Sequence, residues 1–549
     1  MLDLSLKEVE NKMKNKSLKF AGLLTTAIVA PAFFAAPATS GPLNSTARQT
    51  ELSVTNGRIQ APLADAMFAK LNSSTLARNA TSDTDRLLLW HDIMLDSNAL
   101  DHTPGPLPGT QLGPVRNARA FSMTQLAVFD AVNAFKNKFR PYNNIGRAGN
   151  GASVGAAIAY AAHDVLVALY PNQRSRLDQL LVADVSAISN DGASPSAIAG
   201  GRTVGQAAAT AMLNNRLNDG SAHSEPTFGG GGVVANNSNV AFQYPGQTGL
   251  TINGGQTRAP AWTPDPIGVT STGGQRLVAL GARWGNVRPF VLTSGNQFRI
   301  PAPPAPNTAS FRTAFQEVRT DGASPDTPGS TATPAGLFIG NFWGYDGAPL
   351  LGTPPRLYNQ IAVKIANDQG ISKVEDYARY LALINSAMGD SGIGAWDSKY
   401  FYNYWRPVTG VPRAAEDGDA TTAAVAGWKP VGASVINSDH PELFTPPFPA
   451  YPSGHATFGA AMFQVLRSFF PDRTRFTFTS DEYNGLGLDP NGTPRPLVPV
   501  RYRSFQEAQE ENGQSRIFNG VHWQYDNTGG QAMGVNIGNF TVANALTKR

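Results

Sequence analysis

The chain has 549 residues, a net charge of +4 and no cysteine. Without cysteine it forms neither disulfide bonds nor thiolate metal sites, so any metal must be held by histidine, by carboxylate or backbone oxygens, or as an oxyanion. The small net charge gives no indication of a nucleic-acid partner, because that class of protein usually has a concentrated basic surface.

The N-terminus is predicted to be a signal peptide over residues 1–38. Lysines cluster before the apolar run 20–36, and Ala36-Pro37-Ala38 offers small residues for cleavage. The alternative is a membrane anchor, but Pro31 interrupts the run, which is short for a span of roughly 20 residues. We therefore expect export to the periplasm or secretion, with no stable membrane insertion after cleavage.

Polar residues 39–85 are predicted to be a linker or arm, and residues 86–549 a single large helical domain. Residues 222–306 are rich in glycine, asparagine and threonine and end in a proline-rich run. We expect an irregular excursion there that contributes to the rim of a binding site, since long loops often do so.

The predicted fold class is mainly α: helical bundles with long loops and few short strands. Apolar residues recur at helical spacing in the segments 117–138, 152–170, 174–189, 193–218, 308–320, 353–368, 373–389, 398–406, 455–470 and about 520–545. Residues 370–545 are expected to contain the core of the functional site, because three chemically distinctive motifs lie there.

The first motif contains two cations, Lys399 and Arg406, in the run KYFYNYWRP. On one continuous helix, residues at this spacing would point to the same face. The aromatic side chains between them favour a partly buried segment, where two cations require an anion between them. Two solvated surface cations are the alternative.

The second motif is the run YPSGH that ends at His455. Ser453 is predicted to cap a helix that starts near His455. The free N–H groups of its first turn, including that of Gly454, would form an anion site, and His455 would act there as a proton donor or acceptor. An ordinary helix cap also explains this run.

The third motif is SRIFNGVHWQYD, which contains Arg516, His522 and Asp526. A turn at Asn519-Gly520 would let Arg516 and His522 converge. Asp526 lies four residues after His522 and can accept one imidazole N–H, which leaves the other nitrogen free to bind a ligand. A buried, hydrogen-bonded histidine without a ligand is the alternative.

The three motifs, written K-x6-RP, PSGH and SR-x5-H-x3-D, resemble the signature of the acid phosphatase and vanadium haloperoxidase superfamily. Features outside them are similar to the vanadium-dependent, chloroperoxidase-like haloperoxidases. These are Phe448 in the run PPFPAY, Trp396 three residues before Lys399, the segment WGYDG at 343–347, and the length of the chain.

The resemblance implies an enzyme that binds one vanadate and oxidises a halide with hydrogen peroxide to hypohalous acid, with an organic molecule as a further acceptor. Bromide is the expected halide, and Phe448 favours chloride as well. The alternative is an exported acid phosphatase that uses the same oxyanion site with a histidine nucleophile.

The resemblance also implies a role for each motif residue. His522 would be the covalent vanadate ligand, and His455 would take a proton from the peroxide. Lys399 would bind the vanadate and polarise the bound peroxide. Asp346 would pair with Arg516, and Trp396 and Phe448 would line the halide pocket. The remaining groups expected to bind the vanadate oxygens are Arg406, Ser453, Gly454 and Arg516, while Asp526 would orient His522.

Overall fold

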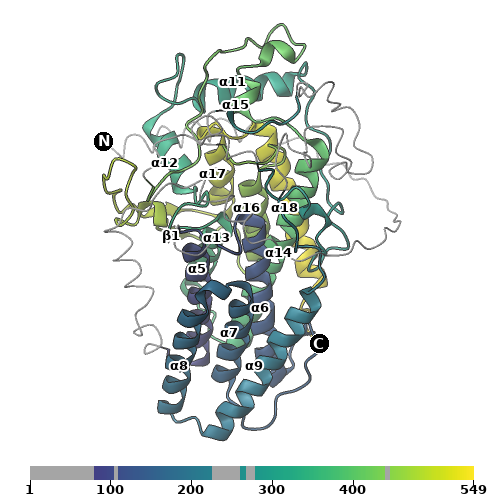
Figure 1. Cartoon of the computed structure of the whole chain (residues 1–549), viewed down its shortest axis with the longest axis vertical. Coiled ribbons are helices and arrows are strands. Elements are labelled where there is room, and N and C mark those ends of the chain that lie inside the picture. Colours follow the sequence, from purple (N-terminus) through teal and green to yellow (C-terminus); the bar gives the residue numbers. More distant parts are fainter. Residues whose placement is uncertain (1–79, 104–108, 226–259, 267–277, 439–444) are drawn as a thin grey trace.

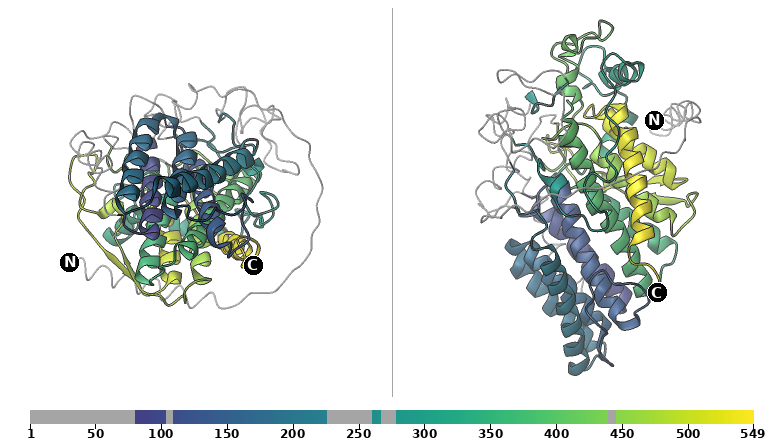
Figure 2. Two further views of the ribbon diagram at one scale, coloured as in Figure 1. Left: turned by 90° about the horizontal axis from the view of Figure 1, so that it is seen from below. Right: turned by 90° about the vertical axis from the view of Figure 1, so that its right-hand side faces the viewer.

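The computed structural model describes residues 80–103, 109–225, 260–266, 278–438 and 445–549. The predicted signal peptide and nearly all of the predicted arm lie outside these residues, as does part of the segment 222–306. The described chain is mainly helical, which confirms the predicted fold class. Its helices form two groups stacked along the long axis of the molecule (Figures 1 and 2).

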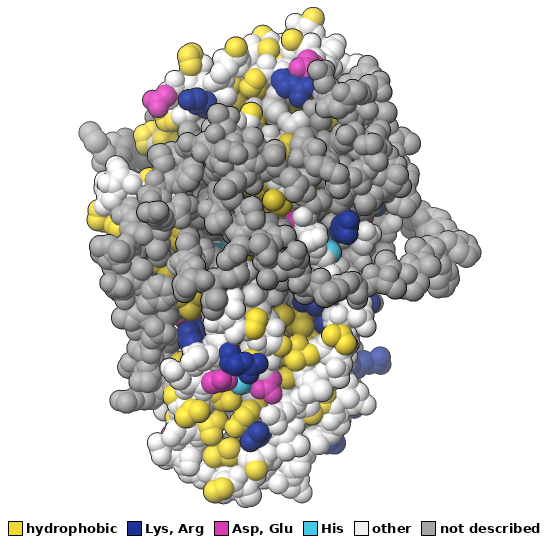
Figure 3. Space-filling model, viewed as in Figure 1, with side chains coloured by type: hydrophobic (Ala, Val, Ile, Leu, Met, Phe, Trp, Pro, Cys, Tyr) yellow, Lys and Arg dark blue, Asp and Glu magenta, His cyan; other side chains and the backbone are white. Residues whose placement is uncertain are grey.

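The N-terminal group occupies the lower half of Figure 1. It comprises α5 (Asp83–Asp101), α6 (Pro114–Lys136), α7 (Val154–Leu169), α8 (Arg174–Asn190) and α9 (Pro195–Arg216), with the short 3-10 helix η1 (Pro171–Gln173). Ser82, Ser153 and Ser194 cap α5, α7 and α9 through their hydroxyl groups. On the face in Figure 3, basic and acidic side chains are mixed with apolar ones over this group.

The C-terminal group contains the long helices around which the site is built. They are α13 (Pro354–Asp368), α14 (Val374–Tyr402), α16 (Gly454–Arg467), α17 (Phe505–Phe518) and α18 (Gln524–Asn544). Shorter elements complete it: α11 (Ala309–Asp321), α12 (Pro334–Phe342), α15 (Pro407–Gly410), η3 (Trp284–Asn286), η4 (Ala414–Glu416) and η5 (Asp481–Tyr483). The strands β1 (Phe476–Phe478) and β2 (Val500–Tyr502) pair antiparallel, and α14 packs against α6 and thereby joins the two groups.

Close packing of α16 on α18 brings the starts of these two helices together. A Cβ atom at Gly534 would lie 2.3 Å from the Thr457 carbonyl oxygen, so only glycine permits this approach. The Ser453 N–H donates to the Asp526 carbonyl oxygen at 2.9 Å. The second and third sequence motifs therefore meet at one end of the helix pair.

Two expectations about helices are wrong. Segments 373–389 and 398–406 belong to one helix, α14, which ends at Tyr402 because Asn403 adopts a left-handed conformation with φ 47°. Arg406 therefore lies beyond the helix and shares no helix face with Lys399. The final helix begins only at Gln524, while α17, which carries Arg516, has a polar sequence that gave no helical signal.

Within the described residues, no single helix has the length and hydropathy needed to cross a membrane. The helix α7 and the following segment Pro171–Asn190 pass this test together by length and composition, but they are bent by 118° relative to each other. Most of α7 is buried among other helices of the N-terminal group.

Asp130 on α6 gives this group a pH-dependent contribution to stability. Its buried carboxylate accepts hydrogen bonds from the backbone N–H groups of Tyr142 at 2.8 Å and Asn143 at 2.7 Å. Burial raises the pKa of Asp130 to about 7. Between its usual pKa of about 4 and this value, the folded chain holds a proton that the unfolded chain releases.

Asp130→Asn is therefore expected to flatten the dependence of stability on pH. The contribution of Asp130 is full below about pH 4 and is lost as the pH rises through about 7, whereas asparagine does not titrate. Thermal denaturation should show a fall in melting temperature between about pH 5 and pH 8 that is a few degrees smaller in the variant. An equal fall in both proteins would contradict this prediction.

Candidate active site

Residues of the second and third motifs line one pocket, and the two cations of the first motif lie behind that lining. Its lining includes Gly454, His455, Arg516 and His522, together with Asp346 and the aromatic residues Trp396 and Phe448. It holds about 780 Å³ of space, part of which is open to solvent. Lys399, Arg406, Ser453 and Asp526 lie behind this lining, in direct contact with it, and are all buried.

His522 sits just before α18, between a carboxylate and a guanidinium. Its Nδ1 lies 2.8 Å from Asp526 Oδ2, and its Nε2 accepts a hydrogen bond from Arg406 Nη1 at 2.9 Å. Since arginine only donates, Nε2 carries the lone pair and Nδ1 the proton. Burial, followed by the charge of Arg406, lowers the pKa of His522 well below its usual range, so the ring is neutral with Nε2 as its basic nitrogen.

Asp526 holds this tautomer in place. Its Oδ2 also accepts the backbone N–H of Trp523 at 3.0 Å, which fixes the carboxylate at the start of α18. Burial raises the pKa of Asp526 to about 7, against the opposing effects of the Trp523 N–H and of Lys399. His522 precedes α18, but the predicted contact between the His522 and Asp526 side chains is present. Gly520, with φ 68°, forms the turn expected between Arg516 and His522.

Arg406 and Arg516 each have buried side-chain donors without a protein partner. Arg406 donates hydrogen bonds from Nε to the Phe448 carbonyl oxygen at 3.0 Å and from Nη1 to the Val521 carbonyl oxygen at 2.7 Å. Arg516 donates from Nη2 to Asp346 at 2.8 and 3.1 Å. Nη2 of Arg406 and both Nε and Nη1 of Arg516 are buried without a protein partner, and burial lowers the pKa of Arg406 to about 9.

Lys399 is fully buried near the end of α14. Its ammonium group donates to the carbonyl oxygens of Pro449 at 2.8 Å and Ala450 at 2.9 Å, which occupies two of its three protons. It lies 5.1 Å from the centre of the Phe448 ring. Burial, with Arg406 adding to the effect, lowers its pKa well below the usual value. A nearby anion would oppose that shift and favour the charged form.

Ser453 caps α16 as predicted, because its hydroxyl accepts the Ala456 N–H at 3.4 Å. The helix starts at Gly454 and not at His455. Its first N–H groups have no acceptor within the helix, and Gly454 lines the pocket. This helix start therefore offers backbone donors to an anion.

His455 is positioned by the segment that contains Asp346. Its Nε2 lies 2.8 Å from the Gly344 carbonyl oxygen, which only accepts, so Nε2 carries the proton in the neutral ring and Nδ1 is the proton acceptor. Burial, followed by the charge of Arg516, lowers the pKa of His455 well below its usual range. Burial likewise raises the pKa of Asp346, against the charge of Arg516.

The aromatic wall of the pocket is formed by Trp396 and Phe448. Their ring centres are 4.8 Å apart, and the Trp396 indole N–H donates to the Leu280 carbonyl oxygen at 3.0 Å. Val278 and Leu280 also line the pocket, so described residues of the segment 222–306 contribute to the site, as predicted.

Several residues that support the site lie outside the three motifs. Glu482 accepts the Tyr345 N–H at 3.0 Å and an N–H of Arg495 at 2.6 Å, and so fixes the segment that contacts His455. Tyr358 and Asn512 both donate to the His455 carbonyl oxygen, at 3.0 and 2.9 Å. Glu482 and Tyr358 lie outside the three motifs and Asn512 lies three residues before the third, so the folded chain reveals their contacts.

Asp346→Asn is expected to weaken oxyanion binding by about 10- to 100-fold, as is typical when the partner of a ligating side chain is changed. The variant removes a negative charge near the anion, but the loss of the ion pair frees the Arg516 guanidinium, and we expect that loss of orientation to dominate. Equilibrium dialysis with orthovanadate measures the affinity, with Asp130→Asn as a buried-carboxylate control outside the site. Tighter binding by the Asp346 variant would contradict the prediction.

Comparison with known proteins shows what the C-terminal group and the fold are similar to. Residues 379–548, which contain Lys399, Ser453, His455, Arg516 and His522, match the family model described as the VCPO second helical-bundle domain. The resemblance to vanadium-dependent haloperoxidases predicted from the motifs is thus confirmed.

Individual proteins show where the similarity lies. The chain is 36% identical over 256 residues to "Vanadium chloroperoxidase" of Curvularia inaequalis, covering 40% of this chain and 41% of that protein. It therefore spans less than half the length of this curated relative. The fold is similar to that of a bacterial vanadium-dependent iodoperoxidase, with a TM-score of 0.62, 22% identity, and coverage of 83% of this chain and 96% of the other. A holo-type bacterial vanadium-dependent chloroperoxidase gives a TM-score of 0.56 at 17% identity, with coverage of 81% and 94%.

Proposed function

We propose that the protein is a vanadate-dependent haloperoxidase, which oxidises a halide with hydrogen peroxide to hypohalous acid. The observation that carries the proposal is the set of unpaired buried guanidinium nitrogens beside His522. Three such nitrogens, Nη2 of Arg406 and Nε and Nη1 of Arg516, lack protein partners. Buried donors without acceptors are costly, and a tetrahedral oxyanion would satisfy them.

The chemistry of the donor set fits vanadate. Arginine forks bind oxyanion oxygens in pairs, the third proton of Lys399 is available to an anion, and His522 offers a basic Nε2. The residues that would hold the oxygens are Lys399, Arg406, Ser453, Gly454 and Arg516, with His522 as the ligand of the metal. Bound vanadate would supply a Lewis-acidic centre that activates peroxide without a change in its own oxidation state.

The side chains around this centre have separable tasks. Neutral His455 takes a proton from the incoming peroxide at Nδ1, while its Nε2–H remains on the Gly344 carbonyl. Lys399 directs positive charge toward the reacting oxygen. Trp396 and Phe448 provide an apolar wall against which the halide sheds water, and the aromatic side chain at position 448 favours the use of chloride as well as bromide.

An acid phosphatase would use the same cationic residues, with His522 Nε2 as nucleophile. Purified protein in phosphate-free buffer distinguishes the two activities. We expect the protein to halogenate a phenol dye only when orthovanadate, peroxide and bromide are all added. The same assay with chloride in place of bromide then tests the second halide. Hydrolysis of a phosphate monoester that vanadate inhibits, with no halogenation, would instead establish the phosphatase.

We also propose that the protein is exported through a cleaved signal peptide at residues 1–38. The support is the arrangement of lysines, apolar run and small residues in the sequence. Expression of the full chain, followed by N-terminal sequencing of the exported protein, should give a start close to residue 39. Retention of the intact N-terminus in the membrane fraction would contradict this.

A further inference from the structure

The peptide between Leu280 and Gly281 is fixed against the aromatic wall of the pocket. The Leu280 carbonyl oxygen accepts hydrogen bonds from the Trp396 indole N–H at 3.0 Å and from the Tyr400 hydroxyl at 2.9 Å. The Leu280 N–H donates to the Pro447 carbonyl oxygen at 3.0 Å. Leu280 therefore connects α14 to the segment before Ser453.

Gly281 brings the backbone into direct contact with the indole. Its φ is 74°, and a Cβ atom there would lie 2.3 Å from Trp396 Cδ1 and 2.4 Å from Nε1. On the far edge of the ring, a Cβ at Gly454 would lie 3.3 Å from Cη2 and Cζ3. The Trp396 indole is thus held between the Gly281 backbone and the start of α16, where the oxyanion is expected to bind.

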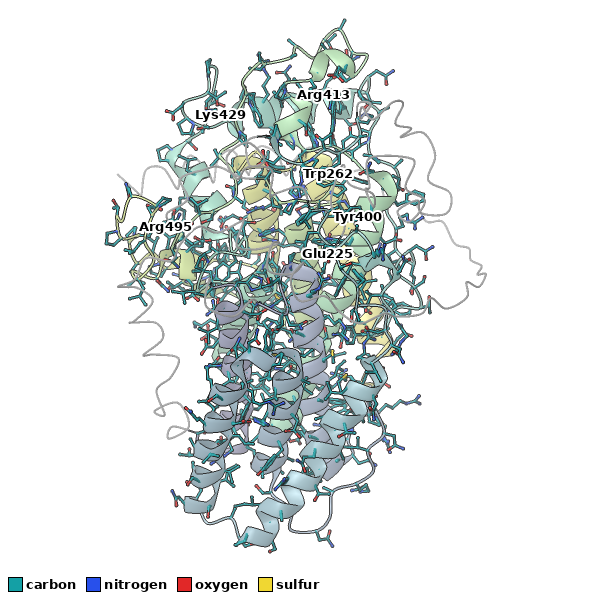
Figure 4. All side chains as sticks on the ribbon, in the orientation of Figure 1. Glu225, Trp262, Tyr400, Arg413, Lys429 and Arg495 are labelled. Atoms are coloured by element: carbon teal, nitrogen blue, oxygen red, sulfur yellow. The ribbon has the colours of Figure 1, made fainter. Side chains whose placement is uncertain are left out.

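A buried ion pair holds Gly281 in this position. One carboxylate oxygen of Glu225 pairs with Nη1 of Arg116, and the other accepts the Gly281 N–H at 2.7 Å. Both ionic side chains are buried, and the Arg116 guanidinium lies 5.3 Å from the centre of the Trp284 ring. Figure 4 labels Glu225 and Tyr400, which contact the two consecutive residues of this peptide.

We propose that Glu225, held by Arg116, is a positioning residue of the halide pocket: it fixes the Gly281 backbone and thereby the Trp396 indole. This inference rests on the proposed haloperoxidase function. Arg116 lies in the first turn of α6, so the pair makes the N-terminal helices a structural support of a site whose motif residues all lie in the C-terminal group. Neither residue lines the pocket itself.

Glu225→Gln tests this role, because glutamine keeps the shape of the side chain but removes its negative charge. That charge holds Arg116 and also strengthens the hydrogen bond from the Gly281 N–H. We expect the KM for bromide to rise roughly 3- to 30-fold, with kcat and the Kd for orthovanadate changed by less than about twofold. The matched control is Asp184→Asn. Asp184 is also a buried carboxylate that pairs with an arginine, Arg86 at 3.3 Å, and accepts an indole N–H, that of Trp90 at 2.9 Å.

A crystal structure of the Glu225→Gln protein gives a readout that does not depend on activity, and the indole should be displaced from the Leu280 carbonyl. A folded variant with an unmoved indole and the bromide KM of the Asp184→Asn control would overturn the inference.

If Glu225→Gln does not fold, Gly281→Ala acts on the same wall with the ion pair intact and should raise the bromide KM. An unchanged bromide KM in Gly281→Ala would also overturn the inference. Absence of halogenation in the wild type would instead contradict the proposed function, while the crystal structure would still test the positioning role.

Discussion

Replacement of His522 by alanine is expected to abolish halogenation and to weaken vanadate binding at least about a hundredfold, since changes in groups one layer further out already cost 10- to 100-fold. The variant removes Nε2, the basic nitrogen that accepts the hydrogen bond from Arg406 Nη1 at 2.9 Å. It also leaves Asp526 without its imidazole partner. Equilibrium dialysis with orthovanadate and the bromide assay measure the two losses separately.

Two variants make this result specific. Asp526→Asn keeps the imidazole but weakens the hold on its tautomer, so we expect an intermediate loss of about 10- to 100-fold in affinity. His91→Gln removes another buried histidine, which lies on α5 and contacts Gln125 at 3.2 Å, and should leave vanadate binding unchanged. Full halogenation by His522→Ala would show that His522 is not the vanadate ligand.

Replacement of His455 by alanine is expected to lower kcat by about 10²- to 10⁴-fold, the usual contribution of a general base. Burial and the charge of Arg516 keep His455 neutral, so Nδ1 is available to take a proton from peroxide. The backbone donors at the start of α16 and the arginine cradle remain, so the affinity for vanadate should change by less than about tenfold. Steady-state kinetics with varied peroxide, together with dialysis, separates the two effects.

Kinetics and dialysis together also show whether His455 binds the anion instead of transferring a proton. If its replacement removes vanadate binding together with activity, the residue belongs to the anion cradle and not to proton transfer. His455→Gln provides a second variant, because its amide can still donate to the Gly344 carbonyl while it lacks a basic nitrogen. We expect it to be as inactive as the alanine variant.

Local sequence patterns predicted most of the helices but not the elements without an amphipathic pattern. Alanine and leucine at helical spacing indicated α6, α7 and α9, whereas the polar sequence of α17 gave no such signal. The expectation of one helix face for Lys399 and Arg406 failed because Asn403 ends α14. Arg406 reaches His522 from a loop, where spacing along a helix carries no information.

For the candidate site too, the sequence predicted only what a local pattern contains. Its motif residues are recognisable because each motif combines chemically distinctive side chains over a few positions, and the structure places them together. Glu225 and Gly281 are separated in sequence from Trp396 by more than a hundred residues, and neither stands in a motif. Their contribution depends on the packing of the N-terminal helices against α14, which a single sequence does not encode in any local pattern.

The most direct test of the central claim is a titration of the phosphate-free protein with orthovanadate, in which bromination and phosphate ester hydrolysis are followed in parallel. We predict that bromination rises until one vanadate is bound per chain and then remains constant, and that His522→Ala shows no such rise. Hydrolysis of the phosphate ester that falls as vanadate is added, with no bromination at any vanadate concentration, would contradict the assignment as a haloperoxidase.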